Sequence, residues 1–305
     1  MATQRIQKFL ASAGFGSRRA CEEMVERGRV SVNGTVSRTL PLIVDPENDR
    51  IAVDGKVIRA ESPAYYLLNK PKGVFCTNDD PAGRTRAVDC LVGVKERVFP
   101  VGRLDADSMG LLLMTNDGEL AQKLTHPRHG VPKTYRVEVA GLPSEGALTK
   151  LRTGVWLSEG KTAPAQITII HKQRDKAILE VTLREGRNRE IRRMLAKLGH
   201  NVRRLTRIRM GKLSIAKLPL GAYRRLTPAE VTYLKLLADG AAEKETRPTS
   251  RSRRPSRAPR KPGGSPRGQT RREQGSTGEG RTRKPASGGR RILMPDSDSP
   301  RKRRD

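Results

Sequence analysis

One acidic segment could carry chemistry in this otherwise basic chain. Residues 102–120, GRLDADSMGLLLMTNDGEL, place four carboxylates around an apolar run at 110–114 that is typical of a buried strand. Asp105 precedes this run by a short loop and follows Arg103 by two residues. In an extended segment both side chains point the same way, so Arg103 can orient Asp105 and keep it ionised. The residues alone leave open whether Asp105 is catalytic or only an ion-pair partner. Asp117 and Glu119 are explained by roles in a turn and at the start of a helix. Asp107 could equally be a turn residue.

A second segment concentrates cations beside a predicted helix. In EGRNREIRRMLAKLGH, residues 185–200, Asn188 can cap a helix whose apolar side chains fall on one face. Arg192 lies on the margin of that face and can reach a partly buried anion. Arg189 and Arg193 point away from it, toward solvent or a phosphate. The next stretch, VRRLTRIRMGK, adds five cations, a density that solubility alone does not explain.

An aromatic residue forms the third candidate. Tyr135 lies in the alternating segment KTYRVEV, which predicts a strand. A strand tyrosine is usually a core or cross-strand residue. Because the body has few aromatic residues, Tyr135 is also a candidate platform for stacking on a base.

An α+β body from about residue 61 to 240 must position these three segments. Strand-like and helical patterns do not alternate regularly along it, which favours a mixed, mainly antiparallel sheet. We predict strands at 65–68, 110–115, 134–139, 165–170 and 177–183, and helices at about 119–125, 144–151 and 189–198.

A small basic unit precedes this body. Residues 1–60 predict a helix over 3–14 capped by Thr3, a second helix from Ser17 to Gly28, and two hairpins at Asn33-Gly34 and Asp54-Gly55. The stretch RIQKFLASAGFGSRRACEEMVERGRVSVNG resembles the S4 RNA-binding domain. That resemblance implies that the second helix and the loop before it lie against structured RNA. The unit presents six cations: Arg5, Lys8, Arg18, Arg19, Arg27 and Arg29.

Charge narrows the class of partner. The 305 residues carry a formal net charge of +30. Residues 241–305 hold 20 Lys and Arg against 7 Asp and Glu, and residues 1–240 hold 42 against 25. The strongly basic body indicates a polyanionic partner, for which nucleic acid is the usual choice. The final segment has almost nothing to bury and is expected to be a disordered basic tail.

The remaining composition excludes several alternatives. No run of about 18 apolar residues predicts a membrane span, and the N-terminus is too polar for a signal peptide. The three cysteines, Cys21, Cys76 and Cys90, are far apart and have no metal-site spacing. We therefore expect a cytoplasmic protein without a structural zinc ion or a disulfide framework.

Together the three candidate segments resemble the successive motifs of the pseudouridine synthases of the RsuA/RluB branch. GRLDADSMGLLLMTNDGEL, KTYRVEV and EGRNREIRRM occur in the order of that branch, and NKPKGV and RLTRIRMGKLSIAKLPLGAYRRLT match as well. The match runs from about residue 3 to 235. The GRNRE segment resembles the large-subunit RNA members more than those with His at position 189, and Glu190 replaces the Gln usual at its position.

The resemblance implies a role for each candidate residue. Asp105 is the essential carboxylate that acts at C1′ of a uridine already in RNA, because breaking the C1′–N1 bond leaves positive character there. Tyr135 stacks on the flipped uracil or assists removal of the C5 proton, Arg192 pairs with Asp105, and Arg103 helps to hold the space that the base vacates. The predicted RNA contacts are Arg5, Lys8, Arg18, Arg19, Arg29, Lys70, Lys133, Arg187, Arg189, Arg193, Arg204 and Arg207.

The leading hypothesis is a monomeric isomerase that converts a uridine of ribosomal RNA to pseudouridine without a cofactor or a metal. Large-subunit RNA is favoured over small-subunit RNA. The alternative is a non-catalytic RNA-binding or ribosome-assembly factor, which has no use for a carboxylate facing its RNA. A metal-dependent nuclease needs clustered carboxylates that Asp105 and Asp107 alone do not supply.

Overall fold

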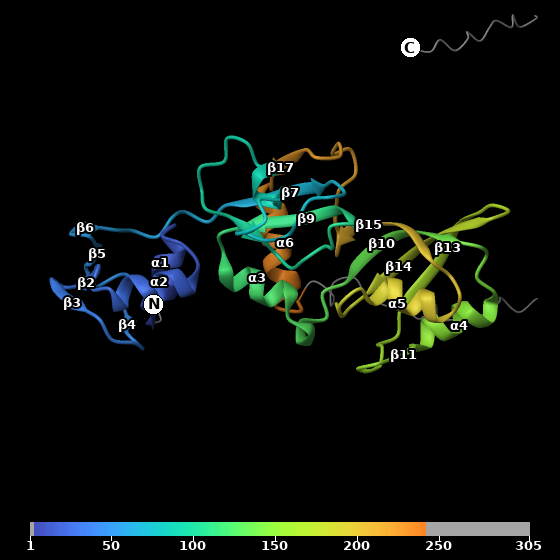
Figure 1. Ribbon diagram of the computed structural model, residues 1–305, viewed down its shortest axis with the longest axis horizontal. Helices are drawn as coiled ribbons and strands as arrows, with labels where there is room; N and C mark the ends of the chain where they lie inside the picture. The colour runs from blue at the N-terminus through green and yellow to red at the C-terminus, as the bar shows by residue number, and fades with distance from the viewer. Residues whose placement is uncertain (1–2, 242–305) are drawn as a thin grey trace, which may run out of the picture. The chain divides into compact units, whose positions relative to one another are not determined.

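The fold is described from a computed structural model for residues 3–241 (Figure 1). The predicted disordered tail falls almost entirely on residues 242–305, outside this described part of the chain. Among residues 3–241, no helix has the length and apolar character needed to cross a membrane.

The N-terminal unit combines two helices with a four-stranded sheet, in strand order β3-β2-β5-β6. Ser17 caps the second helix through its side chain, whereas Thr3 does not cap the first, whose N-cap is Arg5 without a side-chain hydrogen bond. Asn33 and Asp54 adopt the positive φ that the two predicted hairpin turns require. The elements are β1 (Gln4–Arg5), α1 (Ile6–Ser12), α2 (Arg18–Glu26), β2 (Val30–Val32), β3 (Thr35–Ser37), β4 (Ile43–Val44), β5 (Ile51–Val53) and β6 (Lys56–Val57).

A nine-stranded mixed sheet organises the rest of the described chain, in the order β13-β14-β10-β15-β9-β7-β17, with β16 beside β15 and β8 beside β9. Every pair in it is antiparallel except β15 with β9, which confirms the predicted mainly antiparallel sheet. Its strands are β7 (Tyr65–Lys70), β8 (Phe99–Pro100), β9 (Met109–Thr115), β10 (Lys133–Ala140), β13 (Gln166–Lys172), β14 (Lys176–Leu183), β15 (Val202–Met210), β16 (Leu213–Ser214) and β17 (Tyr223–Arg225).

Helices cover the two halves of this sheet separately (Figure 1). Apolar side chains of α3 and α6 pack with Leu111 and Leu113 of β9, and those of α4 and α5 pack with Val137 and Val139 of β10. Each half therefore has its own core. The remaining elements are α3 (Gly118–Thr125), α4 (Glu145–Thr153), α5 (Glu190–Lys197), α6 (Pro228–Ala238), the hairpin of β11 (Trp156–Leu157) with β12 (Gly160–Lys161), and two short 3₁₀ turns, Ala87–Cys90 and Pro127–His129.

The parallel junction between β15 and β9 depends on a glycine. Gly110 is paired with Arg207 and has a φ of 102°. A Cβ atom at this position would lie 2.2 Å from the carbonyl oxygen of Arg207, so a larger residue would push the strands apart. The loop that carries Asp105 leads directly into this junction and is thereby held where the two halves of the sheet meet.

The elements after α5, among them β15 and α6, had not been predicted. β15 alternates apolar and basic residues, and its arginines had suggested a nucleic-acid surface rather than a strand. Yet Leu205 and Arg207 are both buried in the sheet. α6 begins at a capping box formed by Thr227 and Glu230, and Leu234 and Leu237 bury its inner side.

Candidate active site

A buried lysine holds the loop that carries Asp105. Lys70, at the end of β7, is 0% exposed, and its Nζ donates to the carbonyl oxygens of Pro71 (3.0 Å), Asp105 (3.2 Å) and Ser108 (2.8 Å). Burial lowers the pKa of Lys70. A phosphate cannot reach this ammonium, so the predicted RNA contact of Lys70 is wrong. Its ammonium instead binds the backbone around the candidate catalytic carboxylate.

The carboxylate of Asp105 faces a different arginine from the one predicted. Its side chain is 34% exposed, and its Oδ2 lies 3.4 Å from Nη1 of Arg189. Arg192, the predicted partner, forms its ion pair with Asp107 instead, at 3.3 Å. Arg103 is exposed and has no ion pair with Asp105 among the contacts of the described residues.

Asp107 links the two arginines of the basic helix. Its Oδ2 lies 3.1 Å from Nη2 of Arg189 and 3.3 Å from Nη2 of Arg192. Burial raises the pKa of Asp107, but the hydrogen bond from Arg189 and the charge of Arg192 outweigh it and hold that pKa below its usual range. The sequence suggested that Asp107 could be a turn residue, and it did not predict these ion pairs.

Arg192 acts as a largely buried cross-link. Its Nη2 donates to the carbonyl oxygen of Asp107 at 3.3 Å and to Oγ of Ser108 at 3.4 Å, and its Nη1 donates to the carbonyl oxygen of Val202 at 3.3 Å. The helix α5 is thus tied both to the Asp105 loop and to the start of β15.

The backbone at Arg189 explains why this arginine, and not Arg192, meets Asp105. Arg189 is the N-cap of α5 and adopts a left-handed conformation, with φ of 46° and ψ of 34°. The prediction that Asn188 caps the helix is therefore wrong. Arg189 is exposed, as predicted, but a helical projection cannot describe a residue whose backbone leaves the helix, so the ion pairs of Arg189 with Asp105 and Asp107 were not predicted.

A pocket of about 440 Å³ opens beside this ion pair. Asp105, Tyr135 and Arg103 all line it, together with the apolar side chains of Leu104, Leu183, Ile191 and Leu205. Tyr135 is half-buried and packs against the core under α4 and α5 and against a further apolar cluster that includes Leu68 of β7 and Leu112 of β9. The structure thus places three of the four predicted catalytic residues around one cavity, with Arg192 behind it.

A pair of carboxyl groups supports the segment that carries Arg189. Glu190 is 3% exposed, and its Oε2 accepts a hydrogen bond from the backbone N–H of Arg187 at 3.0 Å. Its Oε1 is buried and has no donor partner, while the Glu185 carboxylate is its neighbour. Burial and this second carboxylate raise the pKa of Glu190 to about 8, so the pair shares a proton at neutral pH.

Several other predicted RNA contacts have structural partners instead. Arg207 is 2% exposed, with Nε donating to the carbonyl oxygen of Leu111 at 2.6 Å, so its predicted RNA contact is wrong. Arg187 binds Glu185 and the carbonyl oxygens of Gly160 and Lys161. Arg193 pairs with Glu159, Arg29 pairs with Asp54, and Nζ of Lys133 donates to the carbonyl oxygen of Val131.

The solvent exposure of the remaining predicted contacts is compatible with RNA binding. These exposed side chains are Arg5, Lys8, Arg18, Arg19 and Arg204. For Lys133, by contrast, burial lowers the pKa to about 8, so this lysine is a weaker candidate for a phosphate contact. Within residues 3–241, no group of three or more acidic, histidine or cysteine side chains could hold a metal ion.

Comparison with known proteins identifies both parts of the chain. The S4 domain family matches residues 4–51, and the RNA pseudouridylate synthase family matches residues 64–197. Over 238 residues the chain is 44% identical to ribosomal large subunit pseudouridine synthase B of Bacillus subtilis, covering 77% of this chain and 97% of that protein. The Escherichia coli O157:H7 protein of the same name is 37% identical over 252 residues, covering 80% of this chain and 87% of that protein.

A solved structure shows the same architecture. The crystal structure of a pseudouridylate synthase is 30% identical in sequence and superposes with a TM-score of 0.56, covering 75% of this chain and 99% of that one. The sequence relatives, the shared fold and the carboxylate-lined pocket agree, and the chain belongs to the RNA pseudouridine synthases with an N-terminal S4 domain.

Proposed function

We propose that this enzyme isomerises a uridine of large-subunit ribosomal RNA, with Asp105 as the carboxylate that acts at C1′. The single observation that carries the assignment of Asp105 is its position. Asp105 lines the pocket with Tyr135 and forms its ion pair with Arg189, which lines the same pocket. The other two carboxyl groups of the pocket have structural roles, because Glu185 is bound by Arg187 and by the backbone N–H of Ala163, and Glu190 is buried. The choice of large-subunit RNA is supported by the printed names of the Bacillus subtilis and Escherichia coli relatives.

The reaction rearranges the uridine without adding or removing atoms. The C1′–N1 bond breaks, the uracil turns within the pocket, and C5 bonds to C1′. The proton of C5 then leaves and N1 gains one. A carboxylate supports this sequence either as a nucleophile on C1′ or by stabilising its positive character. Both versions use the carboxylate form of Asp105, against which the guanidinium of Arg189 lies.

The pocket walls suit a base that has left its stack. Leu104, Leu183 and Leu205 provide apolar surface, and the ring of Tyr135 offers a stacking face. Arg103 is exposed at the same pocket and can contact the phosphate or the ribose of the flipped nucleotide. The exposed arginines and lysine of the N-terminal unit are the proposed contacts with the surrounding RNA. A monomeric state and a cytoplasmic location stay predictions.

Replacing Asp105 with Asn tests this assignment. The amide keeps the size of the side chain and removes its charge and nucleophile, so we expect turnover to fall by roughly 10⁴-fold or more. Turnover is measured as tritium release from 5-tritiated uridine in a ribosomal RNA transcript, and RNA affinity is measured on the same preparation. Glu119→Gln makes the same chemical change on an exposed helix residue of the same segment and should leave turnover unchanged.

Near-normal tritium release by Asp105→Asn would contradict the catalytic assignment. Retained RNA binding with lost turnover supports it. Pseudouridine mapping across ribosomal RNA from cells with and without this protein identifies the modified uridine. A missing modification in small-subunit RNA alone would overturn the proposed large-subunit substrate.

A further inference from the structure

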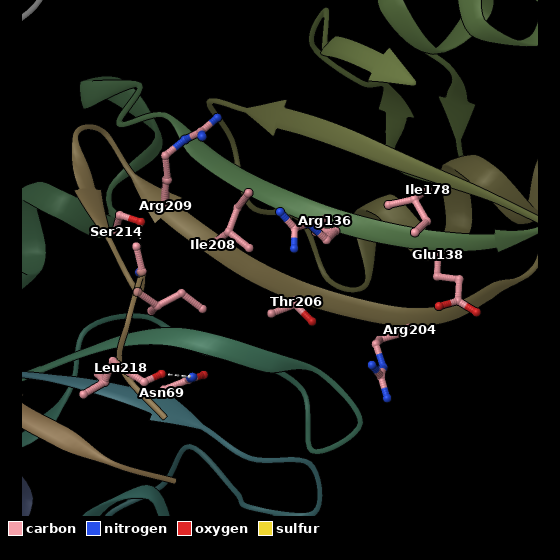
Figure 2. Close-up of a pocket in the computed structure, with 12 residues that line it drawn as sticks. Asn69, Arg136, Glu138, Ile178, Arg204, Thr206, Ile208, Arg209, Ser214 and Leu218 are labelled. Atoms are coloured by element: carbon pink, nitrogen blue, oxygen red, sulfur yellow. Dashed lines mark hydrogen bonds between the residues drawn. The ribbon is translucent and has the colours of Figure 1, made fainter. Parts of the chain in front are cut away.

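A larger pocket of about 590 Å³ lies on the other side of the sheet from Asp105 (Figure 2). Its walls include Arg136 of β10, Arg204 and Thr206 of β15, and Asn69 of β7. Successive residues of a strand point to opposite faces. Tyr135 and Leu205 line the catalytic pocket, whereas their neighbours Arg136, Arg204 and Thr206 line this one.

The charges of this pocket are not balanced. Glu138 pairs with Lys176 at 3.3 Å, and Arg209 pairs with Glu180. Arg136 and Arg204 are exposed and have no ion pair or hydrogen bond from their guanidinium groups within the described part of the chain. Figure 2 shows the guanidinium of Arg204 extending away from Glu138, although the two residues are cross-strand neighbours. Two free cations thus remain on one open strand surface.

The pocket also contains an unsatisfied polar group and an apolar surface. Asn69 is 8% exposed. Its Nδ2 donates to the carbonyl oxygen of Leu218 at 2.8 Å, but its Oδ1 has no partner. Ile208 and Ile178 lie on either side of Arg136 (Figure 2). Guanidinium groups beside hydroxyl, amide and apolar groups match the phosphate, ribose and base of a nucleotide.

We propose that this surface, formed by Asn69, Arg136, Arg204, Thr206 and Ile208 and here called the back-face groove, binds a second segment of the RNA substrate through its phosphates. The proposal rests on RNA being the substrate of the enzyme. RNA is the polyanion that the enzyme must hold, and the groove offers free cations where no helix covers the sheet. Asn69 directly precedes Lys70, so β7 connects the back-face groove to the Asp105 loop.

The double variant Arg136→Gln with Arg204→Gln tests the proposal. With a large-subunit ribosomal RNA transcript, we expect Kd to rise about 10-fold or more at 0.1 M salt. The slope of log Kd against log salt concentration should fall by about 1.4 to 1.8, the value for two lost phosphate contacts. In tritium release the loss should appear in KM rather than in kcat.

A matched control removes two positive charges away from the groove. Arg174 is exposed in the turn between β13 and β14, and Arg203 is paired with Asp175. Arg174→Gln with Arg203→Gln should keep Kd and the salt slope close to those of the wild type. Equal changes in the two double variants would overturn the proposal, because net charge alone would then explain both.

A cross-linking experiment gives direct evidence. A photoreactive benzoylphenylalanine at position 208 should cross-link to the RNA transcript, and the bound nucleotides can then be mapped. Cross-links to protein alone in cells, or no RNA cross-link, would overturn the proposal. Because Asp105→Asn reports on the isomerase assignment separately, unchanged RNA affinity in Arg136→Gln/Arg204→Gln would reject only the back-face groove.

Discussion

Replacing Glu190 with Gln should remove an alkaline limit on both stability and activity. Glu190 is buried beside Glu185, and one of its oxygens has no donor unless the two carboxyl groups share a proton. A glutamine at this position can accept the hydrogen bond from Arg187 N–H and donate to Glu185 without needing that proton. Arg187, Arg193 and Lys133 are the other charged groups whose fields act on Glu190.

The size of the effect follows from the raised pKa of Glu190. Its pKa is about 8 in the folded protein, against an ordinary value of 4.5 for a glutamate. Between these values the folded state holds a proton that the unfolded state has released. The unfolding free energy therefore decreases as pH rises, by about 1.4 kcal/mol per pH unit from this group. Glu190→Gln should lack this contribution, so its advantage over the wild type should grow from pH 5 to pH 8 and then level off.

Urea unfolding at a series of pH values measures the stability difference, and tritium release measures activity over the same range. Above pH 8 the wild type should lose activity, because two adjacent carboxylates repel and disturb the segment that places Arg189 against Asp105. The variant should keep its activity at that pH. Glu119→Gln should show the wild-type profile. Identical pH profiles for the wild type and Glu190→Gln would refute the shared proton and its role in placing Arg189.

Three further substitutions separate positioning from folding. Lys70→Met should cost about 3–5 kcal/mol of unfolding free energy, because it leaves one buried and two partly buried carbonyl groups without their donor, and it should reduce turnover by displacing the Asp105 loop. Urea unfolding and tritium release measure the two effects, and a wild-type unfolding free energy would contradict the anchoring role. Arg189→Ala should reduce kcat strongly with a small change in stability. Arg192→Ala should cost about 2–4 kcal/mol of unfolding free energy, because the Arg192 side chain is a largely buried cross-link with several acceptors. Equal stability losses in the two alanine variants, measured by thermal unfolding, would contradict this division of roles.

Much of the local structure could be predicted because local features determine it. The cap at Ser17 and the turns at Asn33 and Asp54 depend on the conformational preferences of single residues, which a sequence displays. The apolar run of β9 predicted a buried strand, and the strand is buried on both faces. The order of the motifs also predicted that Asp105 and Tyr135 belong to one site, and the two residues line one pocket.

Only the tertiary structure decided which cations face solvent. Lys70 and Arg207 appear in the sequence as members of basic surface segments, yet both are buried and donate to backbone carbonyl groups of distant residues. A charged side chain is buried when the fold brings acceptors to it, and those acceptors lie far away in sequence.

The partner of Asp105 was decided in the same way. A helical projection selects Arg192 as the residue that reaches the carboxylate. The left-handed backbone of Arg189, supported by the Glu185–Glu190 pair and by the contacts of Arg187, selects Arg189 instead. Residue types and their order thus predicted the chemistry and a candidate carboxylate for it. The network that positions it comes from backbone geometry and long-range hydrogen bonds, which no local pattern encodes.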